Sequence, residues 1–324
     1  MFTINTRKAS LISLLILGGM FSGLPVFADS DSRSNDADRH VSDSDNDARD
    51  SSSHHSDSNK SSKDHGKPGV KPPVVKTAVN LGAAATFGAF GGSAGITSQG
   101  VFTVVNGDIG TTGASTLITG FHDRSAVYTE TPLNIGAVNG TIYTATAPVG
   151  SVPSVMASAV ALAAQTAFDN LSPAALPGGM DVSSLGGGAG ELGNRTLAPG
   201  IYRSAPGSFA IQGGDLTLDG KGNPNAVWVF QMASTLTVGG PGAAFPQSVI
   251  LKNGAQAKNI FWQVGSSATI NEAGGGTMVG TIITYATTTV STAGNVNIVT
   301  LNGRALALNA SVTLVNTHIN LPAL

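Results

Sequence analysis

The residues of this chain with the most pronounced chemical pattern are its threonines. Six of the twelve residues from Thr281 to Thr292 are threonine, and none of the twelve is charged. Threonine carries a methyl group and a hydroxyl on one branched carbon, so its side chain has few rotamers. A row of threonines can therefore present a stiff, uncharged surface that donates and accepts hydrogen bonds. The alternative is strand packing alone, because threonine is a favoured strand residue.

Four segments near the end of the chain repeat one two-part pattern, an apolar strand followed by a small, polar strand. They are residues 226–238, 259–271, 279–291 and 302–315. Alignment of their Thr–apolar pairs places Thr235, Thr269, Thr289 and Thr313 at one equivalent position. A second, less uniform set lies two residues further on and consists of Thr237, Asn271, Ser291 and Val315. Such irregular repeats are typical of solenoid coils with insertions.

Side-chain alternation predicts which way the threonines point. Neighbouring residues of a strand face opposite sides of the sheet, so if Leu236 and Val290 point inward, Thr235 and Thr289 point outward. Stacked coils lie about 4.7–4.9 Å apart. The sequence therefore predicts a threonine ladder at that interval on one side of a mainly β solenoid.

One segment, residues 153–173, has the pattern of a helix of about 17 residues. It lacks glycine, is rich in alanine, and has Pro153 and Pro173 at its ends. The predicted apolar side consists of Met156, Val160, Ala163, Ala167 and Leu171, widened by Val155, Ala159 and Leu162. The apolar strands that contain Trp228 and Trp262 are hydrophobic on both sides, as strands covered on both faces are. The helix is therefore predicted to cover these strands and to leave the threonine side bare.

Charge and cysteine content exclude several classes of function. From Thr77 onward the chain has only nine acidic and seven basic residues, about 6% of that part, against a usual value near 25%. No basic stripe is present to follow a phosphate backbone, so nucleic acid is not predicted as a partner. The chain has no cysteine. The scarce acids form no pair at adjacent coil positions, so no catalytic residues, cofactor or metal site are predicted, and the protein is predicted not to be an enzyme.

Four segments are predicted along the chain. Residues 1–28 have a basic start, a short apolar stretch and a small-residue cleavage site after Ala28, as in a secretory signal peptide; an uncleaved membrane anchor is the alternative. Residues 29–66 are predicted to be a disordered Asp/Ser/His-rich spacer, with weak metal binding as the alternative. Residues 67–76 form a proline-rich linker, and residues 77–324 the folded domain. The mature protein is predicted to be secreted and to have no membrane span.

Several motifs across residues 78–320 resemble one known family. They include "GDIGTTGASTLITGF", "LAPGIYR", "NGAQAKNIFWQVGSSATI" and "NGRALAL", and they are similar to those of the large microbial ice-binding proteins. The resemblance implies a right-handed, discontinuous β-solenoid of roughly triangular section, with one long α-helix packed alongside. It also implies that the strands up to about residue 121 join the same solenoid as the last strands.

The family resemblance further implies a function and a site. A flat face of the family's solenoid binds ice, and a T-A/G-x-T/N motif often lies in turns beside it; residues 292–295 match this motif and residues 112–115 nearly match it. The implied ice-binding residues are Thr235, Thr237, Thr269, Thr289, Ser291, Thr292, Ala293, Asn295, Thr313, Thr112 and Ser115. The predicted function is that of a secreted, monomeric antifreeze or recrystallisation-inhibiting protein whose partner is the ice surface. The alternative is a non-enzymatic extracellular adhesin or matrix protein that uses the same solenoid.

Overall fold

The structure, a computed structural model, describes residues 71–75, 79–146, 152–185, 190–240 and 246–323. The chain divides into two units, Met1–Asp64 and His65–Leu324, and all described residues belong to the second. The predicted signal peptide, the spacer and half of the linker lie outside the described residues. Of the linker, residues 71–75 are described, and the Pro73 carbonyl accepts a hydrogen bond from the Ile201 amide at 3.0 Å.

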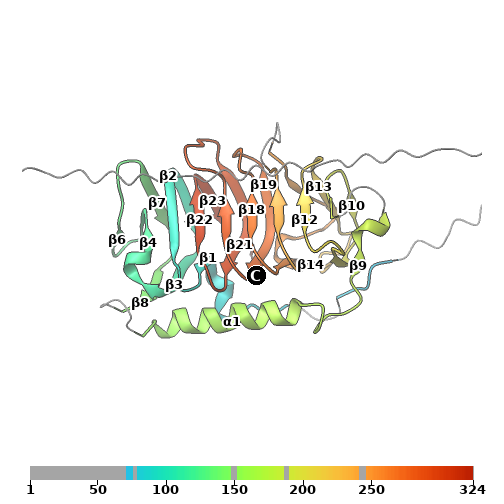
Figure 1. Cartoon of the computed structure of the whole chain (residues 1–324), viewed down its shortest axis with the longest axis horizontal. Helices are drawn as coiled ribbons and strands as arrows, with labels where there is room; N and C mark the ends of the chain where they lie inside the picture. The colour runs from blue at the N-terminus through green and yellow to red at the C-terminus, as the bar shows by residue number, and fades with distance from the viewer. Residues whose placement is uncertain (1–70, 76–78, 147–151, 186–189, 241–245, 324) are drawn as a thin grey trace, which may run out of the picture. The chain divides into compact units, whose positions relative to one another are not determined.

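Most of the described chain is a stack of parallel strands in which each full coil passes through three faces (Figure 1). The first, called the helix face, packs against the α-helix. In stacking order, its strands are β9 (Met180–Asp181), β11 (Gly200–Arg203), β14 (Trp228–Met232), β17 (Ile260–Val264), the second part of β19 (Thr277–Thr284), the second part of β21 (Val299–Ala307), β1 (Phe87–Gly91), β3 (Asp108–Ala114) and β8 (Ile142–Ala145).

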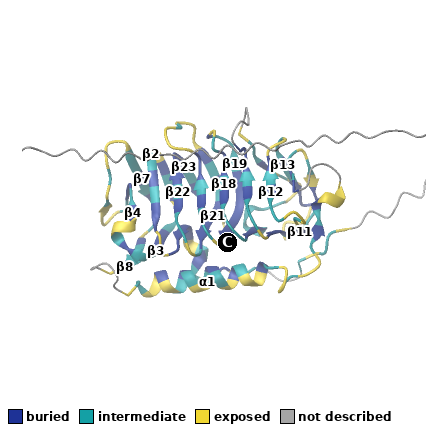
Figure 2. Cartoon of the chain, in the orientation of Figure 1, coloured by how far each residue is buried: buried dark blue, intermediate teal, exposed yellow. Residues whose placement is uncertain are grey.

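The second face, called the threonine face, has shorter strands. In stacking order, they are β12 (Phe209–Ile211), β15 (Leu236–Val238), β18 (Ala268–Ile270), β20 (Thr288–Val290), β22 (Val312–Val315), the first part of β2 (Ile96–Asn106) and β4 (Ile118–Thr119). Buried and half-buried residues alternate along these strands (Figure 2). That alternation is typical of strands with one face on a core and the other toward water.

The third face consists of two groups of strands. The first group is a separate three-stranded sheet of β10 (Thr196–Leu197), β13 (Leu216–Asp219) and β16 (Val249–Lys252). The second group comprises the first parts of β19 and β21, then β23 (Thr317–Asn320), the second part of β2, β7 (Asn134–Val138), β5 (Phe121–His122) and the antiparallel β6 (Val127–Tyr128).

The stack is discontinuous in sequence. Strand β1 pairs with β21, placing Ala89 opposite Ala305, and β2 pairs with both β22 and β23. The first coil of the chain therefore lies beside the last one, and the segment with the helix is inserted between β8 and β9. The predicted joining of early and late strands is confirmed.

The helix α1 (Val155–Leu171) has the 17 residues predicted for it. It begins after Ser154, whose hydroxyl accepts a hydrogen bond from the Ala157 amide at 3.1 Å, and it ends before Ser172 and Pro173. Such a cap satisfies one of the free amides of the first turn. Four short 3₁₀ helices also occur among the described residues: η1 (Gly82–Thr86), η2 (Ser115–Leu117), η3 (Val182–Leu185) and η4 (Ala257–Asn259). None of the described helices has the length and apolarity needed to cross a membrane.

The predicted apolar side of the helix is partly wrong. Val155 and Leu162 are 89% and 70% exposed, and Met156 is 39% exposed. The side that packs on the sheet is mostly alanine, because the outward side chains of the helix face, including Phe261 and Ile283, already fill the contact layer. A small helix residue allows the backbone to approach such large neighbours. Val155, Met156 and Leu162 are exposed, and the exposed side of α1 faces away from the sheet (Figure 2).

Aromatic residues fill the interior of the solenoid. The rings of Phe230 and Trp262 stack with centroids 4.0 Å apart and planes at 10°. Both tryptophans are fully buried, and each indole N–H has an acceptor: Trp228 donates to the Leu197 carbonyl and Trp262 to the Val279 carbonyl. Both tryptophans thus belong to the core, as predicted for strands that are covered on both faces.

Candidate functional site

A row of six threonines runs along the threonine face, one from each of six successive coils. The paired strands place each of these residues directly opposite the next. In stacking order, this central rank consists of Thr237, Thr269, Thr289, Thr313, Thr97 and Thr119. Each lies between two buried residues of its own coil, so its side chain points away from the core. At the β12 end the rank stops at Ala210, which is opposite Thr237.

A second row of hydroxyls lies beside the first, two residues earlier in each coil. This flanking rank consists of Ser208, Thr235, Ser267, Thr287 and Ser311. Hydroxyls of adjacent coils touch along it, with 3.0 Å between the side-chain oxygens of Ser208 and Thr235 and again between those of Ser267 and Thr287. The next coil has Gly95 at this position, which ends the rank.

The two ranks together form a regular, uncharged lattice. Strand geometry sets a spacing of about 4.8 Å along the stack and about 6.7 Å between the ranks. All eleven side chains are half-buried, and none can ionise. Within the described part of the chain, the hydroxyls of Thr237, Thr269, Thr289 and Thr313 have no protein hydrogen-bond partner, so they are free to bond water. Their branched side chains restrict rotation, which keeps each methyl and hydroxyl in place.

The predicted register of the threonine ladder is wrong by two residues in one coil. Thr237, and not Thr235, pairs with Thr269, whereas Thr235 belongs to the flanking rank. Because side-chain direction repeats every two residues, the slip leaves Thr235 on the same face. Thr269, Thr289 and Thr313 lie opposite one another as predicted.

Of the predicted second set of outward residues, only Thr237 points outward. Asn271, Ser291 and Val315 are all at most 1% exposed. Asn271 and Ser291 have φ values of +47° and +64°, so the backbone turns at the strand end and directs their side chains inward. Asn271 then bonds both the amide and the carbonyl of Gln247. Ser291 therefore cannot contribute to an exposed surface in this conformation.

The two turn motifs lie at opposite edges of the threonine face. Thr292 and Ala293 are exposed in the turn that leads from β20 to the third face, and Asn295 bonds backbone groups of its own and the neighbouring turn. Thr112 and Ser115 lie at the other edge, where the chain arrives from the helix face, and the Thr112 hydroxyl donates to the Gly92 carbonyl. The structure thus does not bring the two motifs together.

Sequence reasoning missed six members of the two ranks. They are Thr97, Thr119, Ser208, Ser267, Thr287 and Ser311. A usable signal was present, because "SVTL", "GITS" and "LITG" all place a threonine after a buried apolar residue. Its recognition requires the knowledge that the coil containing Thr97 stacks on the coil containing Thr313.

The threonine-rich stretch from 281 to 292 divides between interior and surface. Thr281, Thr284 and Thr288 are fully buried, whereas Thr287 and Thr289 lie on the threonine face. The hydroxyls of Thr284 and Thr288 lie 3.1 Å apart inside the solenoid. Strand packing and surface chemistry therefore both account for this composition.

Ionisable groups with shifted pKa lie outside the two ranks. On the third face, hydrogen bonds from the side chain and backbone of Lys221 and from Asn253 lower the pKa of Asp219 to about 2. In β21, burial lowers the pKa of Arg304 to about 10, and its guanidinium donates to the Ala85 carbonyl. Among the described residues, no group of three or more His, Asp or Glu could hold a metal ion.

Comparison with known proteins agrees with this architecture. The model of the ice-binding-like family matches residues 90–320. The chain is 36% identical over 235 residues to an ice-binding protein of Nostoc sp. (strain HG1), which covers 72% of this chain and 71% of that protein. It is 35% identical over 249 residues to an ice-binding protein of Leucosporidium sp. (strain AY30), which covers 76% and 84%.

A solved structure extends this comparison to the fold. The ice-binding protein 1 domain of Shewanella frigidimarina superposes with a TM-score of 0.61 at 26% identity, covering 79% of this chain and 100% of that one. The family match begins in β1 and ends in β23, so it includes the central rank and the helix packed behind it. By this extent of similarity, the chain belongs to the ice-binding-like family.

Proposed function

We propose that this protein binds ice and that the threonine face is the surface that adsorbs to it. The observation that carries the proposal is the central rank, six threonines in register on successive coils. The relatives from Nostoc and Leucosporidium, which are named ice-binding proteins, support the same function.

The mechanism rests on many weak contacts made at once. Each hydroxyl can hold a water molecule, and each methyl group limits competing hydration beside it. A single water-mediated hydrogen bond contributes little. A face that is rigid before binding, however, loses little side-chain entropy when it adsorbs, which is the cost that weakens flexible binders. Adsorbed molecules would then curve the growing ice front and slow its advance and recrystallisation.

The other two faces are poorer candidates for the adsorbing surface. The helix face is covered by α1, whose Ala157, Val160 and Leu171 are buried against it. The third face has no uniform rank, and Asp219 and Lys221 place an ion pair with a 2.8 Å contact there. Charged groups hold water around themselves and would interrupt a regular hydration pattern.

We also propose that the protein acts outside the cell as a monomer. The signal-peptide pattern of residues 1–28 supports export. Both ranks are formed entirely within one chain, so the face needs no second copy to be complete.

Ice assays on the purified protein test this function. We expect it to shape single ice crystals and to suppress recrystallisation at micromolar concentration or below. A protein that does neither under conditions where it is folded by circular dichroism would contradict the proposal. That result would favour the adhesin or matrix alternative, which uses the same solenoid without ice.

A further inference from the structure

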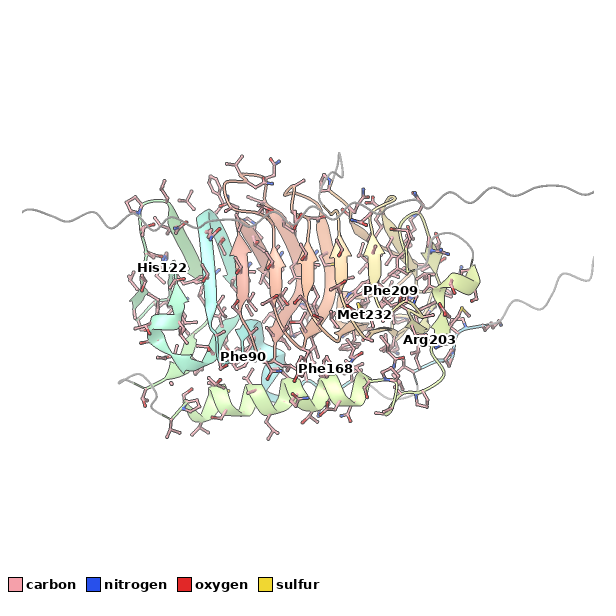
Figure 3. The ribbon with its side chains drawn as sticks, in the orientation of Figure 1. Phe90, His122, Phe168, Arg203, Phe209 and Met232 are labelled. Carbon is pink, nitrogen blue, oxygen red and sulfur yellow. The ribbon has the colours of Figure 1, made fainter. Side chains whose placement is uncertain are left out.

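A cleft of about 310 Å³ lies where the end of α1 meets the turns between the helix face and the threonine face. Phe168 and Pro173 line it from the helix side, and Met232, Gln263 and Tyr285 line it from the coils. Phe168 lies on α1 on the side toward the sheet, and Met232 lies at the end of β14 (Figure 3). No lining residue belongs to either rank of the threonine face.

Two aromatic rings stand at this cleft. Tyr285, in the turn between β19 and β20, is 53% exposed. Its ring lies 6.5 Å from that of Phe168, with the two planes inclined at 46°. An exposed aromatic ring beside a second ring offers a flat apolar surface to a ligand.

The cleft also contains a buried amide that the fold does not use. Gln263 is 6% exposed, and its side chain has no hydrogen-bond partner among the described residues. Gln231 occupies the same position in the adjacent coil, yet its amide nitrogen donates to the carbonyls of Leu171 and Leu176. The nitrogen and oxygen of the Gln263 amide keep contact with the solvent of the cleft, so they can bond water or a ligand that enters it.

The backbone keeps this space free of side chains. A Cβ at Gly265 would lie 2.3 Å from the Ala233 carbonyl oxygen, so this position accepts no larger residue. Gly265 and Ala233 lie side by side in adjacent turns and both line the cleft. The hollow is therefore a consequence of how closely these coils stack.

The chemistry of the cleft selects one class of ligand. None of the described side chains that line the cleft is charged, so an ion would lose its hydration without compensation. A purely apolar ligand would leave the Gln263 amide unpaired. A volume of about 310 Å³ is at the small end of the range for ligand pockets, about 300–1,000 Å³.

We propose that this cleft binds a neutral sugar ring of a poly- or oligosaccharide. The apolar C–H face of a pyranose packs against the Tyr285 ring, and a ring hydroxyl bonds the Gln263 amide, which both donates and accepts. Occupation of the cleft leaves the two ranks uncovered, so this activity is separate from the proposed ice binding.

Calorimetric titration of the purified protein with cellotetraose, maltotetraose and mannotetraose, each tested alone up to ~10 mM, measures this binding. We expect at least one of them to bind with a Kd of about 0.1–1 mM, the range of a small, shallow site. Absence of binding by all three would overturn the proposal.

Variants of the cleft locate the site. Tyr285→Ala should weaken binding tenfold or more, and Tyr285→Trp should retain it. Phe102→Ala is the matched control, since Phe102 is a similarly exposed aromatic (47%) outside the cleft. Equal affinity of Tyr285→Ala and the wild type would overturn the assignment.

A second variant separates recognition from folding. Gln263→Leu keeps the size of the side chain and removes the unpaired amide. We expect weaker saccharide binding with an unchanged or higher Tm, because no hydrogen bond of the fold is lost. Unchanged affinity in this folded variant would contradict the role given to the amide.

Discussion

The threonine face and the third face are built from the same coils, and helix α1 covers neither, yet their outward residues differ. At the central position of the threonine face, six successive coils all carry threonine. At one position across five strands of the third face, the residues are Thr300, His318, Val104, Ala137 and His122. The stacking of coils therefore gives both faces a regular spacing between side chains. The sequence determines on which face the same type of side chain recurs at each position.

The third face uses its regular spacing in a different way. Four asparagines form a chain of side-chain hydrogen bonds across its strands: Asn139 donates to Asn106, Asn106 to Asn320 and Asn320 to Asn302. These amides satisfy one another. Most hydroxyls of the central rank have no such partner within the described structure and remain available to water.

The largest effect is expected from a substitution in the interior that both faces share. Trp262→Ala deletes the ring stacked on Phe230. We expect it to lower the free energy of unfolding by about 3–5 kcal/mol, measured by denaturant titration. A loss below about 1 kcal/mol would show that the stacked core does not support the coils as described.

A second variant tests whether the coil that comes from the start of the domain contributes to the ice-binding surface. Thr97 comes from near the start of the chain and lies between Thr313 and Thr119 in the central rank. Thr97→Tyr should reduce recrystallisation inhibition about tenfold, equivalent to about 1.4 kcal/mol, with little change in Tm. Val104→Tyr is the control, because Val104 is half-buried on the third-face part of the same strand. Equal losses in both variants would contradict a face-specific effect.

A smaller effect separates the hydroxyl from the methyl group. Thr313→Val keeps the shape of the side chain and removes a hydroxyl that has no described protein partner. We expect recrystallisation inhibition to fall about two- to fivefold, because one of many water contacts is lost. Thr313→Ser, which keeps the hydroxyl, measures the methyl contribution. An unchanged activity in both variants would argue against the lattice as the binding surface.

The smallest effect is expected from pH. The two ranks contain no ionisable group, so ice activity should stay constant between about pH 5 and pH 9. Stability behaves differently on the third face, where the pKa of Asp219 is lowered to about 2. A lowered folded-state pKa contributes stability above the unfolded value, and this contribution is lost as the pH falls toward 2. Thermal unfolding of Asp219→Asn should accordingly lose this part of the acid dependence, and an identical acid profile would contradict it.

Side-chain alternation predicted the outward direction of the threonines but could not fix their register. Thr235–Leu236 and Thr237–Val238 are both Thr–apolar pairs, and an alignment on either keeps threonine on the same face. Alternation also failed at Ser291, because a left-handed backbone at the strand end reverses the direction of the side chain. Local sequence pattern does not reveal such a turn in a non-glycine residue.

The helix and the pairing of early with late strands show a different limit of prediction from sequence. The bounds of α1 follow from Pro153, Pro173 and the run without glycine, all local signals. The side of α1 that packs depends on the shape of the sheet below it, so the sequence pattern predicts the wrong side for Leu162, which is 70% exposed. The membership of Thr97 and Thr119 in the central rank depends on pairing between the two ends of the domain, which required the family resemblance or the structure.

A matched pair of variants tests the central claim most directly. Thr289 lies in the middle of the central rank, and Thr217 is a half-buried, outward threonine of the third face. Fluorescently labelled Thr289→Tyr and Thr217→Tyr would be compared with the wild type for incorporation into a growing ice hemisphere. The account predicts that Thr289→Tyr is excluded from the ice and that Thr217→Tyr is incorporated like the wild type. Incorporation of folded Thr289→Tyr, or exclusion of Thr217→Tyr alone, would contradict it.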